Sequence, residues 1–135
     1  MEWAHELYVH AIAVEAEAAR RYAELARRMA GLGEEAAAAL FAELAAADAR
    51  HTEALRRRTQ RVHLPDLTCD HSWADASAAS PRQALSIALK AERDARAFFQ
   101  HARRIAQEPA ALALAEEMAL EESEHIARIE RLCRP

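Results

Sequence analysis

The sequence predicts an all-α protein built as a four-helix bundle. Ala, Glu, Arg and Leu dominate its 135 residues and only two Gly are present, a composition that favours long helices. Apolar residues recur at steps of three and four along four stretches, as they do on the buried face of a helix. We call the line of side chains at these steps the seam of each helix. Residues that end helices lie between the four stretches, which separates four elements.

The first two stretches predict a tight helical hairpin. The first helix is expected over about residues 4–30, with Gly31 at its C-terminal cap because glycine adopts the left-handed conformation there without strain. The second helix is expected to begin after Gly33 and to run to about residue 61. Pro65 lies just beyond and cannot continue a helix.

A second hairpin follows in the C-terminal half of the chain. Ser80, Pro81 and Gln83 form a helix start, with a capping hydroxyl, a proline at the first position and an amide at the third. This helix is expected to run to about Gln107, and Pro109 opens the fourth helix.

The segment between the hairpins, residues 62–80, is longer than a bundle turn needs. At ~3.3 Å per residue it reaches roughly 60 Å, against roughly 40 Å for a helix of this size. The sequence therefore predicts one domain, residues 1–135, in which two antiparallel hairpins are joined by one long crossover.

Six ionisable residues interrupt the otherwise apolar seams. Along the chain they form the order carboxylate, carboxylate-x-x-His, carboxylate, carboxylate-x-x-His, which is the ligand pattern of a di-metal carboxylate site. The spacing of three residues places both members of each pair on one helix face. The six residues are Glu15, Asp48, His51, Glu92, Glu122 and His125.

Charge and position both favour metal ligands over a polar core network, which is the alternative reading. No Lys or Arg on the seams could neutralise the four carboxylates, and two divalent cations would balance them. Measured from the turns near Leu32 and Glu108, all six residues lie at similar distances along their helices. Antiparallel helices rise equally from their turn, so the six side chains are expected to meet near the middle of the bundle.

The net charge and the lack of a visible targeting signal indicate which kinds of partner the protein binds and in which cellular compartment it lies. The net charge is −4 and no basic block is present, so we expect neither a nucleic-acid partner nor a membrane partner. No signal peptide and no apolar run of membrane-spanning length is visible. We therefore expect a cytoplasmic protein. Cys69 and Cys133 lack metal-type spacing, and in that compartment they are expected to be free thiols.

On these residues, the chain resembles the rubrerythrin and ferritin-like di-iron family over all four predicted helices. The resemblance implies that the six seam residues bind two iron ions, with manganese or zinc as alternatives. The chain departs from the family in three places. Asp48 stands where the family usually has Glu, and Ala95 stands where rubrerythrins carry an additional Glu. Two Cys cannot build the Cys₄ module, so the resemblance is to the rubrerythrin-type four-helix domain alone.

The resemblance and the site together predict a di-iron carboxylate oxidoreductase. It would react with peroxide or O₂ and would need an external electron donor, because the chain lacks a cysteine cluster to receive electrons. The alternative is a ferritin-like iron-binding and storage protein with ferroxidase activity, and a third interpretation is a non-redox metal-binding bundle. We expect a homo-oligomer and favour a dimer.

Other polar residues receive simpler interpretations. Tyr22 lies on the seam two turns after Glu15, where it is either an ordinary core tyrosine or a group that hydrogen-bonds a ligand or donates an electron. Several glutamates off the seams are expected to be surface charges. They are Glu17, Glu43, Glu116, Glu117, Glu121 and Glu124.

Overall fold

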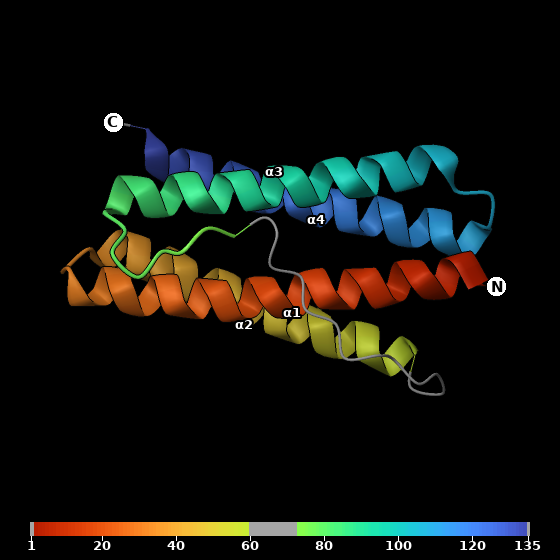
Figure 1. The fold of residues 1–135 in the computed structure, drawn as a ribbon, viewed down its shortest axis with the longest axis horizontal. Coiled ribbons are helices and arrows are strands. Elements are labelled where there is room, and N and C mark those ends of the chain that lie inside the picture. Colours follow the sequence, from red (N-terminus) through yellow and green to blue (C-terminus); the bar gives the residue numbers. More distant parts are fainter. Residues whose placement is uncertain (1, 60–72, 135) are drawn as a thin grey trace.

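The computed structural model describes residues 2–59 and 73–134, and these residues form four helices (Figure 1). No strand occurs among the described residues, so the predicted all-α four-helix bundle is confirmed. The helices are α1 (Glu2–Gly31), α2 (Glu35–Arg58), α3 (Pro81–Ile105) and α4 (Pro109–Cys133).

The helix directions confirm the crossover between two hairpins. In Figure 1, α1 and α2 form one antiparallel pair, and α3 and α4 form the other. α2 ends at the opposite end of the bundle from the start of α3, so these two helices run in the same direction. The chain must therefore travel back along the bundle between Arg58 and Pro81, although residues 60–72 lie outside the described part.

The turn between α1 and α2 is closed by Gly33 rather than by the predicted Gly31. Gly33 has a positive φ of 75°, and its N–H donates to the carbonyl of Ala30 at 3.1 Å. The N–H of Glu34 donates to the carbonyl of Met29 at 2.9 Å. These two bonds form a Schellman motif with Gly33 at the C′ position, so the helix continues through Gly31.

The start of α3 confirms the capping signal in the sequence. The N–H of Gln83 donates to the hydroxyl of Ser80 at 3.2 Å, and the N–H of Ser80 donates to the side-chain carbonyl of Gln83 at 2.9 Å. Two backbone donors that the helix cannot satisfy internally are thereby satisfied. This box fixes where the second hairpin begins and therefore the register of α3 in the bundle.

The core consists of two apolar clusters at opposite ends of the bundle. One includes Leu7, Leu55 and Phe99, and the other includes Tyr22 and Phe41. A layer of buried ionisable residues lies between them along every helix. The fold therefore places charged groups at the depth where burial costs most.

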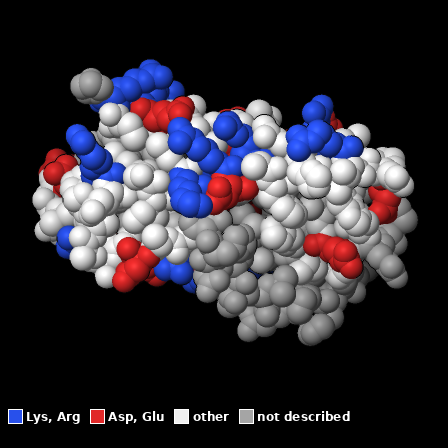
Figure 2. All heavy atoms as spheres, turned by 45° about the horizontal axis from the view of Figure 1, so that its top comes forward, with Lys and Arg blue, Asp and Glu red and all other residues white. Residues whose placement is uncertain are grey.

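Charges on the outer faces are mixed in sign. Figure 2 shows basic and acidic side chains side by side on one face of the molecule. Lys90 pairs with Asp94 at 2.7 Å, and Arg93 pairs with Glu130 at 3.0 Å. Among the described residues, no helix is both long enough and apolar enough to cross a membrane.

Candidate metal centre

The four helices bring the six predicted site residues into one layer. α1 and α3 each contribute one carboxylate, whereas α2 and α4 each contribute a carboxylate and an imidazole from adjacent turns. Five of the six residues are buried, and His51 is half-buried. The residues are Glu15, Asp48, His51, Glu92, Glu122 and His125.

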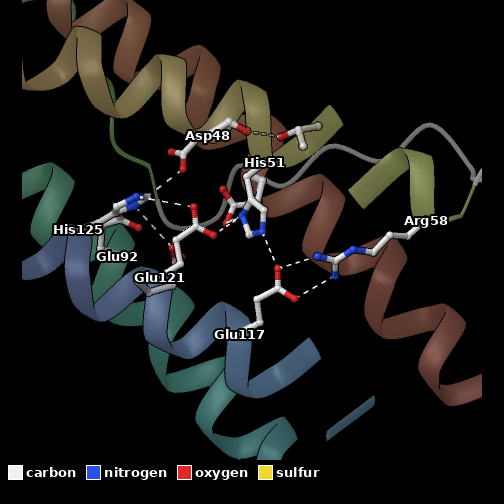
Figure 3. A network of polar contacts seen from close by, with 10 residues as sticks. Asp48, His51, Arg58, Glu92, Glu117, Glu121 and His125 are labelled. Carbon is white, nitrogen blue, oxygen red and sulfur yellow. Dashed lines mark hydrogen bonds and ion pairs between the residues drawn. The ribbon is translucent and has the colours of Figure 1, made fainter. Parts of the chain in front are cut away.

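His125 lies at the meeting point of three helices (Figure 3). Its Nδ1 donates a hydrogen bond to Oε2 of Glu92 on α3 at 2.8 Å. The same nitrogen lies 3.8 Å from Oδ1 of Asp48 on α2 and 3.8 Å from Oε1 of Glu122 on α4. One nitrogen thus faces three carboxylates.

His51 forms the other side of the layer. Its Nδ1 lies 3.6 Å from Oε1 of Glu15 and forms an ion pair with Oε2 of Glu121 on α4. Its Nε2 points away from the layer and donates to Oε2 of Glu117 at 3.0 Å. Nδ1 is therefore the nitrogen that faces the buried carboxylates.

Three overlapping groups of residues could hold a metal ion. In each group one ligand atom per residue lies within 4.8 Å of the others. The groups are Glu15, His51 and Glu121; Asp48, Glu121 and His125; and Glu92, Glu122 and His125. All six predicted residues take part.

Six buried side-chain atoms in this layer lack a hydrogen-bond partner among the described residues. They are both carboxylate oxygens of Glu15, both of Asp48, Nδ1 of His51 and Oε2 of Glu121. Buried polar atoms are almost always hydrogen-bonded, because leaving one unpaired costs about 1–3 kcal/mol. Several unpaired oxygen and nitrogen donors that converge on one layer are the arrangement a cation requires. The residues present therefore fit a metal.

Burial changes the acid–base properties of the metal-free layer. It raises the pKa of Glu15 and raises the pKa of Asp48 and Glu122 well above the usual range, and neighbouring carboxylates add to the effect. Contact with Glu121 raises the pKa of His51 to about 11. Burial works to lower the pKa of His125, but the hydrogen bond to Glu92 and the nearby carboxylates outweigh it and raise the pKa.

These shifts predict that the metal-free protein loses stability as pH rises from about 5 to about 9. A group whose pKa is raised on folding binds more protons in the folded state than in the unfolded state. Raising the pH from its unfolded-state pKa to its folded-state pKa therefore favours unfolding. For the buried carboxyl groups the interval starts at 3.8–4.5, and for His51 it runs from 6.5 to about 11. The pKa values of Glu17 and Glu117 are lowered, so these two groups change the stability only below about pH 4.5. Melting curves of chelator-treated protein across this range would test the prediction, and a melting temperature that rises with pH would contradict it.

An ion-paired glutamate holds the outer nitrogen of His51. Glu117 accepts from the guanidinium of Arg58 through both oxygens, at 2.9 and 3.0 Å, while it accepts from Nε2 of His51 (Figure 3). Arg58 lowers the pKa of Glu117 and keeps it ionised. A carboxylate on the outer nitrogen of a histidine fixes the ring orientation and makes the inner nitrogen a better ligand.

Tyr22 contacts the layer from the neighbouring apolar cluster. Its hydroxyl donates to Oε2 of Glu92 at 2.8 Å, and the side chain is fully buried. Burial, followed by the nearby Glu92 and Asp48 charges, raises the pKa of Tyr22 well above 10, which keeps the hydroxyl protonated. Of the two interpretations of Tyr22, the structure favours a group that hydrogen-bonds a predicted ligand.

Three of the glutamates expected at the surface are placed differently by the structure. Glu121 is half-buried and faces both His51 and His125, and Glu117 contacts His51. Glu17 is only 6% exposed, because Arg20 and Arg21 fold over its carboxylate. One signal could have identified Glu121: it precedes His125 by four residues and therefore shares its helix face.

A four-helix bundle with a central layer of carboxylate and imidazole donors defines the ferritin-like class of metal-binding proteins. The model of the rubrerythrin family matches residues 6–73, half of the chain. The chain belongs to the rubrerythrin family.

A solved structure extends this likeness to the whole fold. It is an uncharacterized conserved protein from Magnetospirillum magnetotacticum MS-1, 27% identical in sequence, with a TM-score of 0.81. The alignment covers 96% of this chain and 95% of that chain. None of the curated proteins compared with the chain matches it.

Proposed function

We propose that this protein is a di-iron oxidoreductase that reduces peroxide or O₂ with electrons from a separate donor. One observation supports the proposal most strongly: buried carboxylate oxygens and one imidazole nitrogen from α1, α2 and α4 converge on one layer without hydrogen-bond partners among the described residues. Such a layer is unfavourable without cations and is well suited to them.

The donor set favours a pair of ions. Glu15 and His51 lie on one side of the layer, and Glu92, Glu122 and His125 lie on the other. Mixed carboxylate and imidazole donors suit iron, and also manganese or zinc. Bound as a pair, iron would supply the two electrons that reduction of peroxide to water requires.

The residues around the layer position the ligands and exclude water. Apolar clusters close both ends of the layer along the bundle axis. Tyr22 holds Glu92 on one side, and Glu117 with Arg58 holds His51 on the other. Among the described residues of the layer, partial solvent access is found at two side chains, His51 at 16% and Glu121 at 17%. We expect a small oxidant to enter on this side, between α2 and α4.

The electron donor is expected to be a separate molecule. The chain has two cysteines, and Cys133, the one within the described residues, is exposed at the end of α4. Cys69 lies outside the described residues. Two cysteines cannot form a Cys₄ iron site that would pass electrons to the layer.

Stopped-flow oxidation tests the proposal. Protein loaded with ferrous iron should be oxidised by peroxide or O₂ faster than free ferrous ion in the same buffer. It should then stop after one turnover until a donor is added. Oxidation no faster than in buffer would reject the enzyme and leave a metal-binding bundle.

A size measurement separates this proposal from iron storage. We expect a dimer in the cytoplasm, whereas storage with ferroxidase chemistry requires a shell of many subunits that retains iron. Light scattering coupled to size exclusion, before and after iron loading, distinguishes the two.

A further inference from the structure

Glu121 lies between the two imidazoles of the layer. Its Oε2 forms the ion pair with Nδ1 of His51, and its Oε1 lies 3.7 Å from Nε2 of His125. It comes from α4, one residue before the predicted ligand Glu122. One side chain thus reaches both sides of the layer.

We propose that Glu121 is a further metal ligand, the fifth carboxylate of the centre, an inference that rests on the metal centre of the proposed function. Glu121 is shared by two of the three groups that could hold an ion. Its buried Oε2 and Nδ1 of His51 form an ion pair that lacks hydrogen-bond geometry, and neither atom has another hydrogen-bond partner among the described residues. Two donor atoms that face each other in this way are placed to share a cation.

The fully buried carboxylates support the same point independently. Glu15 and Asp48 are each 1% exposed, and all four of their oxygens lack hydrogen-bond partners in the described part of the chain. Each belongs to a group that also contains Glu121. The unpaired atoms on the α1 and α2 side therefore converge on Glu121.

Glu117 provides a comparison within the same protein, because it orients a histidine without facing the buried layer. It accepts a hydrogen bond from Nε2 of His51 at 3.0 Å and is held by Arg58. Glu121 instead faces the inner nitrogen of His51 through Oε2, while its Oε1 lies near Nε2 of His125, the nitrogen opposite the one that faces Glu92. The two glutamates occupy opposite sides of the same ring and have different roles.

A fifth carboxylate changes the total cation charge that the ligands of the centre neutralise. Four carboxylates balance two divalent cations, whereas five balance one divalent and one trivalent cation. Neutral imidazoles add no charge when they bind metal. Glu121 should therefore strengthen the binding of trivalent ions more than that of divalent ions.

Terbium is a suitable trivalent probe because its luminescence can be excited through nearby aromatic rings. Tyr22 donates to Glu92, and its ring centroid lies 5.2 Å from that of Trp73. Luminescence lifetimes in H₂O and D₂O report how many waters remain on the bound ion. This count shows whether the ion has lost a protein ligand.

The test compares metal-free wild-type protein with Glu121→Gln and with Glu124→Gln, an exposed site on the same helix. Glu121→Gln should weaken terbium binding by about 10-fold or more. It should add about one water to the ion, because water fills a coordination position that a side chain vacates. Manganese binding should weaken by a smaller factor, and Glu124→Gln should match wild type.

Two outcomes would overturn the inference, and they are distinguishable. If Glu121→Gln and Glu121→Ala both keep the water count and the terbium affinity of wild type, Glu121 is not a ligand while the centre stands. If wild-type protein takes up neither terbium nor manganese, the metal centre itself is rejected, and the role of Glu121 falls with it.

Discussion

Glu122→Ala is expected to remove most of the metal that the protein retains, whereas Glu124→Ala is expected to leave it unchanged. Glu122 is 2% exposed and lies in one of the three groups that could hold an ion. Glu124 is an exposed residue two positions later on the same helix. Losing a residue that only supports a ligand costs about 10- to 100-fold in metal affinity, so losing a ligand should cost at least as much.

Elemental analysis of protein reconstituted with ferrous iron and then dialysed would measure the difference. Glu92→Ala should behave like Glu122→Ala, because Glu92 contacts His125 within the same group. Glu124→Ala is the matched control, since it removes the same side chain from α4 without touching the buried layer. Equal metal content in the three variants would reject the assignment of the ligands.

Periodicity was enough to place the buried charges of this protein. A step of three or four residues finds the line of side chains that faces the bundle axis, and Asp48 and Glu122 lie on that line. Equal distances from the turns then predict that the charges meet at one level, because antiparallel helices rise at the same rate. The structure brings these residues together, although their role as ligands stays a prediction.

The flanks of the helices were harder to predict. Glu121 is one residue off the seam, and whether such a side chain is buried depends on how α4 rotates against α2. Glu17 is covered because two arginines adopt rotamers that bring them over it, and no pattern of hydrophobicity encodes a rotamer. Long-range contacts and side-chain conformations determine whether such residues are buried. The three- and four-residue periodicity of the sequence contains neither kind of information.

The choice between two glycines at the first turn illustrates the same limit. Gly31 and Gly33 are both able to adopt a left-handed conformation, so composition alone allows the helix to end at either. The structure uses Gly33, because that choice lets Gly33 and Glu34 satisfy two carbonyls of the last turn. The capping box at Ser80 was predictable because both partners are side chains specified by the sequence.

Without metal, the buried acids of the layer should lower the free energy of unfolding of the protein. Glu15 and Asp48 are the two carboxylates whose four oxygens all lack hydrogen-bond partners among the described residues. Burial raises the pKa of both, which means that their charged forms oppose folding. Metal binding would reverse the sign of this effect, because a cation turns the same charges into favourable partners.

The double variant Glu15→Gln, Asp48→Asn is therefore expected to stabilise the metal-free protein and to lose the stabilisation that metal provides. Replacing two buried acids, which must either stay charged or take up protons on folding, should gain on the order of 2 kcal/mol at neutral pH, reduced by whatever the new amides leave unpaired. Denaturant unfolding of metal-free and metal-loaded samples measures both quantities on the same proteins. Glu124→Gln is the control, because Glu124 is exposed and lies on α4 outside the layer. A clear loss of metal-free stability in the Glu15, Asp48 variant, with the control unchanged, would show that the carboxylates are satisfied without metal and would contradict a layer built to hold cations.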